Sequence, residues 1–226
     1  MNQHSKSEVR TGTQLRDKVR GLVRDELLQA AESIFAEEGL QTAKVESIAA
    51  RAGVSVGTVY NYFADRKALV DAVMESRKQD LFRRLQELET QTEGRPFLER
   101  LEMTLETVLA YFQSQRPYFL LMLQAEGAPS FKQALLSAPD PCKGPFGSIF
   151  EHLEKLMVQG IAEGSLRAED PKLLALFLAA ISRGVSLSAM ADPQVPNDVR
   201  ERRTLILRFF LHGAGPSGPA PKLRAL

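Results

Sequence analysis

The amino-acid sequence predicts an all-α fold of about nine helices, and three observations support this prediction. Apolar residues recur every three or four positions through most of the 226-residue chain, which is the spacing of one helix face. Glycine and proline fall between these periodic segments, at the places where helices begin and end. No stretch shows the alternation of apolar and polar residues that is typical of a strand. We therefore expect helices packed on helices, without a sheet.

Composition and charge are those of an ordinary water-soluble chain. Hydrophobic residues make up 44%, charged residues 25%, and the formal net charge is only +1, which by itself does not indicate nucleic-acid binding. We find no apolar run of the roughly 20 residues that span a bilayer, and no apolar signal peptide near the start, so we expect a cytoplasmic location. The single cysteine, Cys142, excludes an internal disulfide, and we interpret it as a small apolar residue and not as a redox sensor.

The stretch from Ile48 to Leu69 has the pattern of a helix, a tight turn, a second helix and the start of a third. Gly53 is expected to end the first helix, because glycine best tolerates the left-handed conformation common at helix C-termini. Ser55 provides a hydroxyl N-cap for the second helix. Val59 and Phe63, four residues apart, would then share the face that packs on a core. This pattern predicts a helix-turn-helix.

The outer face of that second helix carries residues suited to contact with DNA. Gly57 has no side chain, so the backbone can approach DNA closely. Thr58 offers a hydroxyl and a methyl group to a phosphate or a base edge, and Tyr60 and Tyr62 offer phenol hydroxyls to phosphates. We infer that this helix reads the major groove.

Cationic residues flank the motif on both sides. Arg66 and Lys67 stand in the first turn of the third helix, where they oppose the helix dipole, so an external anion is a reason for their presence. A second cationic group precedes the motif and comprises Arg10, Arg16, Lys18, Arg20 and Arg24. Two interpretations of this group stay open: a basic arm that lies along or in the minor groove, and a solvated charged face on an extended first helix.

The motif resembles the DNA-binding signature of the TetR family of bacterial transcriptional regulators. The resemblance covers roughly residues 24–71, and it rests on Ile48, Ala49, Ala52–Ser55, Gly57–Tyr60, Tyr62, Phe63 and Lys67–Leu69. The chain has Ala43 and Lys44 where the family usually has threonine or serine, and Arg66 at the position of a phosphate-contacting lysine. The motif and the resemblance together give these candidate DNA-contacting residues: Lys44, Ser47, Ser55, Val56, Gly57, Thr58, Tyr60, Asn61, Tyr62, Arg66 and Lys67.

We expect four segments along the chain. They are a flexible N-terminal arm (1–14), the helix-turn-helix DNA-binding domain (15–70), a larger helical ligand-binding and dimerisation domain (71–212) and a disordered tail (213–226). The apolar spacing and the glycine and proline positions predict helices at about 14–39, 45–52, 56–63, 65–92, 96–115, 116–123, 146–164, 171–190 and 197–211.

Aromatic and methionine residues gather in the middle of the chain, and ligand pockets are rich in such residues. The candidates are Met103, Tyr111, Phe112, Phe119, Met122, Phe146, Phe150 and Phe177. At helical spacing these residues are more often plain core, so both interpretations stay open. The resemblance implies a small-molecule cavity among these helices. It also implies that the two C-terminal helices pair with their twins in a two-fold dimer, whose reading helices bind a palindrome.

Motifs of known enzymes and metal sites are missing from the sequence: there is no phosphate loop, HExxH, CxxC or GxSxG. We interpret His152, which stands between Glu151 and Glu154, as part of a solvated helix face and not as a metal ligand. We therefore expect no catalytic residue, no metal, no cofactor and no membrane partner. The hypothesis is a homodimeric repressor that a small-molecule ligand releases from a palindromic operator. The alternative is an effector-independent DNA-binding structural or partner-recruiting protein of the same fold.

Overall fold

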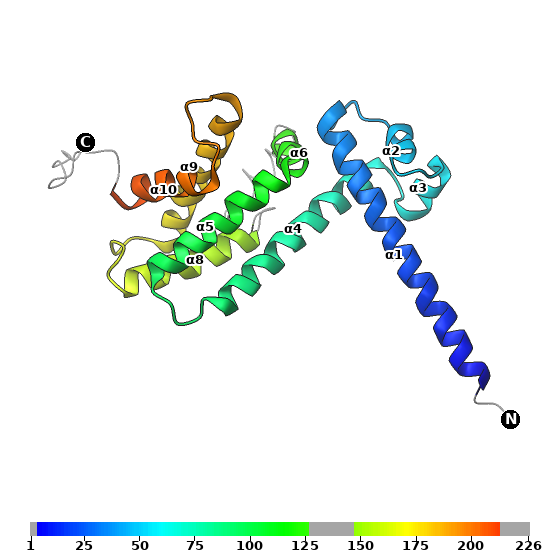
Figure 1. The fold of residues 1–226 in the computed structure, drawn as a ribbon, viewed down its shortest axis with the longest axis horizontal. Coiled ribbons are helices and arrows are strands. Elements are labelled where there is room, and N and C mark those ends of the chain that lie inside the picture. The colour runs from blue at the N-terminus through cyan, green and yellow to red at the C-terminus, as the bar shows by residue number, and fades with distance from the viewer. Residues whose placement is uncertain (1–3, 127–146, 213–226) are drawn as a thin grey trace. The chain divides into compact units, whose positions relative to one another are not determined.

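The structure, a computed structural model, describes residues 4–126 and 147–212. Within these two ranges it contains nine helices and no strand, which confirms the all-α prediction. The helices in Figure 1 are α1 (His4–Glu38), α2 (Val45–Arg51), α3 (Val56–Tyr62), α4 (Arg66–Gln91), α5 (Phe97–Ser114), α6 (Arg116–Glu126), α8 (Gly147–Ala162), α9 (Pro171–Ala191) and α10 (Val199–His212). The predictions for Cys142, Phe146 and the tail 213–226 fall outside the described residues.

The helix ends agree closely with the predicted ones, except at the N-terminus. Helix α1 begins at His4 and not near Gln14, so the start predicted for the first helix is wrong. The reason is that apolar periodicity detects only a helix with a buried face. Residues 4–13 contain one aliphatic residue, Val9, and no proline, so they neither show this periodicity nor break the helix.

The chain folds into two compact units. The first contains α1, α2, α3, α6 and the part of α4 up to Gln79, and the second contains the rest of α4 with α5, α8, α9 and α10. This division differs from the boundary expected at residue 71. Helix α6 joins the first unit because it packs along α1, and Leu121 of α6 is fully buried in the core of that unit.

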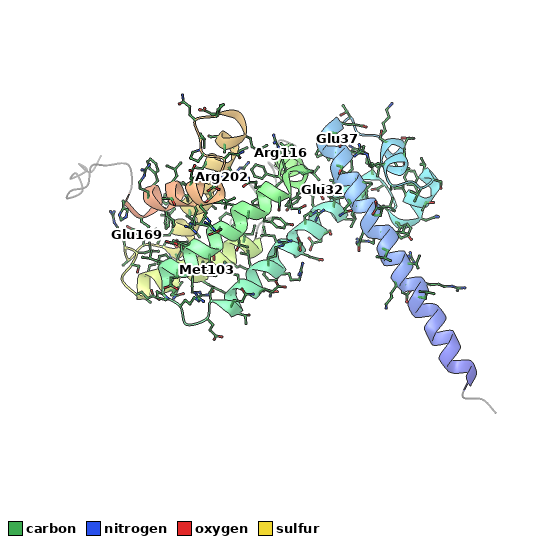
Figure 2. All side chains as sticks on the ribbon, viewed as in Figure 1. Glu32, Glu37, Met103, Arg116, Glu169 and Arg202 are labelled. Atoms are coloured by element: carbon green, nitrogen blue, oxygen red, sulfur yellow. The ribbon has the colours of Figure 1, made fainter. Side chains whose placement is uncertain are left out.

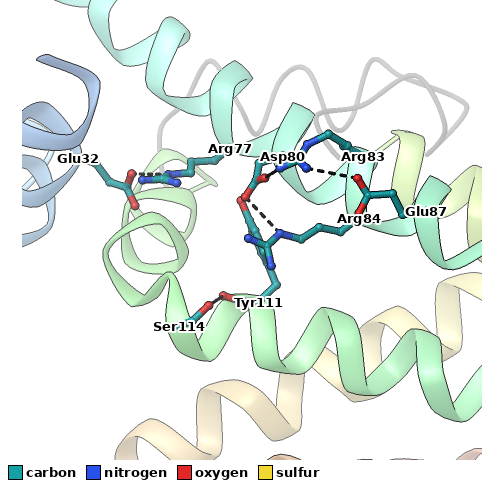
Figure 3. Close-up of polar contacts among 8 residues, drawn as sticks. All are labelled: Glu32, Arg77, Asp80, Arg83, Arg84, Glu87, Tyr111 and Ser114. Carbon is teal, nitrogen blue, oxygen red and sulfur yellow. Dashed lines mark hydrogen bonds and ion pairs between the residues drawn. The ribbon is translucent and has the colours of Figure 1, made fainter. Parts of the chain in front are cut away.

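Helices α1 to α4 enclose one core in the first unit. Its fully buried side chains include Leu27, Phe35, Ile48 and Leu69. Two ion pairs tie α1 to its neighbours. The Nε atom of Arg77 in α4 lies 2.6 Å from a carboxylate oxygen of Glu32, which is itself buried (Figure 3). Glu37 lies at the end of α1 (Figure 2), and Arg51 of α2 donates to both of its carboxylate oxygens at 2.7 and 3.1 Å. These hydrogen bonds hold the pKa of Glu37 below its usual value.

A separate core lies in the second unit, among α5, α8, α9 and α10. Its members include Leu101, Met157, Leu178 and Ile206. Gly160 in α8 is required here for close approach: a Cβ atom at this position would lie 2.8 Å from the ring of Phe97 and 2.8 Å from the side chain of Leu166.

Helix α10 is fastened to α5 by polar contacts. Arg203 donates to Glu106 at 2.5 Å, and the buried Arg202 donates to the side-chain oxygen of Gln113 at 2.7 Å.

Helix α9 is more apolar than the sequence analysis recognised. By length and composition, Pro171–Met190 is long and apolar enough to cross a membrane, which corrects the expectation that no such run exists. The run was missed because charged Lys172 and Arg183 interrupt it. Asp170 caps this helix by accepting a hydrogen bond from the Lys172 backbone at 2.9 Å, as the Asp170–Pro171 pair predicted.

Candidate nucleic-acid interface

The turn between α2 and α3 is a Schellman motif. The backbone N–H of Val54 donates to the Ala49 carbonyl at 3.0 Å, and that of Gly53 donates to the Ala50 carbonyl at 3.2 Å. Gly53 has a φ of +67°, in the left-handed region that favours glycine. The predicted helix stop is therefore confirmed, and the motif sets a sharp angle between the two helices.

Helix α3 begins with the predicted hydroxyl cap. The Ser55 Oγ atom accepts a hydrogen bond from the Thr58 backbone at 3.1 Å and lies 2.9 Å from the Thr58 hydroxyl. Val59 and Phe63, at 1% and 5% exposed, anchor the opposite face of the helix in the core, as predicted. Ser55 thus holds the start of α3 in place, and the half-buried Thr58 keeps its hydroxyl next to that cap.

Three neighbouring residues form the open face of α3. Gly57 and Asn61 are exposed, and Tyr60 is 50% exposed. A Cβ atom on Gly57 would touch only the Ser55 Oγ atom, at 3.7 Å, which is an ordinary van der Waals contact. Packing within the described part of the chain therefore does not require glycine at this position.

Other candidates face partly inward. Val56 and Tyr62 are half-buried and pack against the core of the first unit. In α2, Ser47 is half-buried, whereas Lys44 is exposed at the N-cap position and makes no side-chain capping bond. The Thr42 hydroxyl instead donates to the Glu38 carbonyl at the end of α1, so it caps α1 and not α2.

Arg66 braces the loop that joins α1 to α2. Its Nε atom donates to the Ala43 carbonyl at 3.2 Å, another N–H donates to the Leu40 carbonyl, and the guanidinium lies 5.4 Å from the centre of the Phe35 ring. This arrangement differs from the solvent-facing cation that the sequence predicted. The loop carbonyl groups point at the start of α4, and such groups need a donor.

Lys67, the next residue, remains exposed. Its ammonium group lies 2.5 Å from the Asp71 carboxylate, and this hydrogen bond raises the pKa of Lys67. Asp65 caps α4 as predicted, since it accepts from the Ala68 backbone at 2.7 Å. Lys67 and Lys44 are therefore the candidate cations that stay open to solvent in this part of the unit.

Comparison with known families decides what this unit is. Residues 27–73 match the profile of the family described as bacterial regulatory proteins, tetR family. Residues 27–73 therefore form a DNA-binding segment of the TetR-family type. One relative, the HTH-type transcriptional repressor KstR2 of Mycobacterium tuberculosis, is 38% identical over 89 residues, which cover 38% of this chain and 44% of KstR2. The curated relatives are thus matched over less than half of their length at this level of identity.

Solved structures of TetR-like regulators share the fold of most of this chain. FadR of Bacillus subtilis, in complex with stearoyl-CoA, superposes with a TM-score of 0.71 at 17% identity, covering 84% of this chain and 98% of FadR. PfmR of Thermus thermophilus, a TetR-family transcriptional regulator, gives a TM-score of 0.66 at 19% identity and covers 86% of this chain and 98% of PfmR. At such identities the likeness concerns the fold alone.

The candidate pocket residues are divided between the two units. Phe119 and Met122 are buried in the first unit, whereas Met103, Phe112 and Phe150 lie half-buried in the second. Phe177 of α9 is 52% exposed and so does not line an interior. The buried side of α9 carries Ala175 and Leu178, and at 100° per residue Phe177 points away from both.

Tyr111 is part of the packed interior of the second unit. It is 2% exposed, the Arg84 guanidinium lies 5.2 Å from its ring centre (Figure 3), and Phe112 makes an edge-on contact with it. Asp80 holds Arg84 in this position through a contact of 3.3 Å.

A buried polar cluster in the second unit escaped the sequence analysis. His152 is only 6% exposed, with its Nε2 atom 3.2 Å from the Thr104 hydroxyl and its Nδ1 atom 3.7 Å from Glu89. The interpretation of His152 as a solvated residue is therefore wrong, because α4, α5 and α8 meet around it. Burial lowers the pKa of His152, although Glu89 opposes this shift. The signal was present: His152 lies next to Leu153, on the buried face of α8. Among the described residues, no group of side chains is arranged to hold a metal ion.

Proposed function

We propose that this chain is a sequence-specific DNA-binding transcriptional regulator, a homodimeric repressor that a small molecule releases from a palindromic operator. One observation carries the proposal: α3 is fixed at its start by a Schellman turn and a serine cap, and its open face presents Gly57, Tyr60 and Asn61. A short helix with one anchored and one bare face is suited to enter a major groove. The family match covers this segment.

The individual DNA contacts divide by chemistry. We assign base-edge contacts to Thr58 and Asn61, which offer a hydroxyl with a methyl group and an amide. Tyr60, Lys44 and Lys67 would contact phosphates, since their polar ends are exposed. Arg66 would act indirectly, by holding the loop and hence α2 in place.

Dimerisation would involve α9 and α10. Leu173, Leu176 and Phe177 of α9 are 40%, 41% and 52% exposed, and Phe209 of α10 is 41% exposed. Contiguous apolar surface of this kind marks protein interfaces. A two-fold dimer would present two α3 helices to the two halves of a palindrome. A cytoplasmic location fits a DNA partner, and α9 would then be covered by the second copy and not by lipid.

The effector would bind in the second unit, where Met103, Phe112 and Phe150 are half-buried and the His152–Thr104 pair is buried. Because the FadR structure holds stearoyl-CoA, acyl-CoA esters are the first compounds to screen. Release would be a shift between two arrangements of the dimer. Moving this equilibrium from 1:99 to 99:1 requires about 10⁴-fold tighter binding to the released arrangement.

The experiment is a fluorescence-anisotropy titration of DNA from upstream of the chain's own gene, compared with a scrambled duplex of equal length. We expect a clear preference for the natural DNA. Thr58→Ala should reduce the affinity for the natural DNA more than the affinity for the scrambled duplex. Equal losses on both duplexes would refute the assignment of base reading to Thr58. If no acyl-CoA or other core-binding ligand changes the affinity, the effector-independent alternative is favoured.

A further inference from the structure

Helix α1 continues well beyond the helix-turn-helix. It is 35 residues long, and in Figure 1 its blue N-terminal half extends past α2 and α3. On this extension Leu15, Val19 and Leu22 are 64%, 52% and 70% exposed, so core packing does not explain why the helix is so long.

Three arginines share one face of the extension. Arg16, Arg20 and Arg24 stand at i, i+4 and i+8, and all three are exposed. None of them forms an ion pair with a carboxylate among the described residues. At a rise of 1.5 Å per residue they span about 12 Å, which corresponds to about three or four base-pair steps along the DNA axis.

This arginine face lies next to the reading helix. The Arg20 guanidinium is 5.8 Å from the centre of the Tyr62 ring, at the last residue of α3, and the Arg24 guanidinium is 5.7 Å from the centre of the Phe63 ring. Contacts with aromatic rings limit the freedom of both arginines, so less entropy is lost when they bind a ligand. Lys18 points elsewhere, because it is turned by about 160° from Arg20 around the helix.

We propose that Arg16, Arg20 and Arg24 form a second DNA-binding element, which holds the phosphate backbone beside the half-site read by α3. The inference rests on the proposed function and adds to it. An unpaired guanidinium is a strong donor to phosphate oxygens, and three on one face suit a polyanion. The apolar face of the same helix suits an anionic membrane instead, but the ring contacts turn Arg20 and Arg24 towards the end of α3 and so favour DNA.

The test measures how DNA affinity depends on salt. Each lost phosphate contact reduces the slope of log K against log salt concentration by about 0.9. With a random-sequence duplex as the probe, the triple variant Arg16→Gln, Arg20→Gln, Arg24→Gln should lose about 2 to 3 from this slope. The matched pair is Arg20→Gln and Lys18→Gln. Each variant removes one positive charge, and the two residues lie on opposite faces of α1. We expect a reduction of about 0.9 for Arg20→Gln and none for Lys18→Gln.

Removing the negative charge of Asp17 should change the DNA affinity in the opposite direction. It lies about 60° from Arg20 around the helix and is exposed, so it repels phosphates near the arginine face. Asp17→Asn should therefore raise the affinity for the same duplex, with the larger gain at low salt.

The possible failures are distinguishable. If the unaltered protein shows no salt-dependent DNA binding, the proposed function itself fails. If it binds but the triple variant keeps the slope of the Lys18→Gln variant, with unchanged helix content by circular dichroism, this inference fails and the proposed function stands. Binding to vesicles of phosphatidylglycerol and phosphatidylethanolamine that is lost in the triple variant, with an unchanged DNA slope, would overturn it in favour of a membrane surface.

Discussion

Replacing Gly57 by alanine separates what the fold needs from what DNA binding needs. Glycine within a helix costs about 0.5–1 kcal/mol relative to alanine, and a new Cβ atom would meet only the Ser55 Oγ atom, at an unstrained 3.7 Å. Gly57→Ala should therefore stabilise the protein by up to about 1 kcal/mol, which corresponds to a rise of roughly 1–4 °C in Tm for a chain of this size.

The same methyl group should weaken DNA binding, because it would stand between the backbone of α3 and the groove. Inserting a methyl group into a well-packed contact costs about 1–3 kcal/mol, which is roughly a 5- to 150-fold loss of operator affinity. Thermal unfolding and anisotropy measure the two effects on one sample. Gly21→Ala is the matched control: no atom lies within 4 Å of its added Cβ, so it should stabilise without loss of affinity. A stabilised Gly57→Ala variant with unchanged affinity would refute the placement of α3 in the groove.

Three further substitutions test the packing of the units. Arg77→Ala leaves the buried carboxylate of Glu32 without its ion pair and should lower the free energy of unfolding by about 3 kcal/mol in urea denaturation, and adding Glu32→Gln should recover part of this loss. Gly160→Ala should cost about 1–3 kcal/mol, because the new Cβ atom meets the Phe97 ring at 2.8 Å. Because burial lowers the pKa of His152, the unfolded state takes up a proton first as the pH falls below about 6.5. The free energy of unfolding should therefore stay constant above about pH 6.5 and fall on acidification from there down to the lower folded-state pKa. The His152→Gln variant should lack this dependence.

Local rules account for the features that the sequence predicted well. Gly53, Ser55, Asp65 and Asp170 each act on backbone groups within a few residues, so the chain neighbours contain all the information that is needed. The periodic apolar residues of α2 and α3 likewise identify the buried face, which the structure confirms for Ile48 and Val59.

The features that sequence reasoning missed depend on long-range contacts. Arg66 donates to carbonyl groups more than twenty residues earlier, and His152 meets Thr104 and Glu89 from two other helices. Neither arrangement leaves a pattern in the adjacent sequence. Phe177 was misassigned for a related reason: on a helix that is apolar nearly all round, composition does not indicate which side packs inside the unit.

The most direct test of the regulator account is a DNase footprint of the purified protein on DNA from upstream of its own gene and its neighbours, with random DNA as competitor. The account predicts saturable protection of one palindrome, with half-sites about one helical turn or a multiple apart. Protection of that palindrome should weaken in Gly57→Ala and persist in Gly21→Ala. Binding that spreads evenly over the fragment and disappears with competitor would contradict the account.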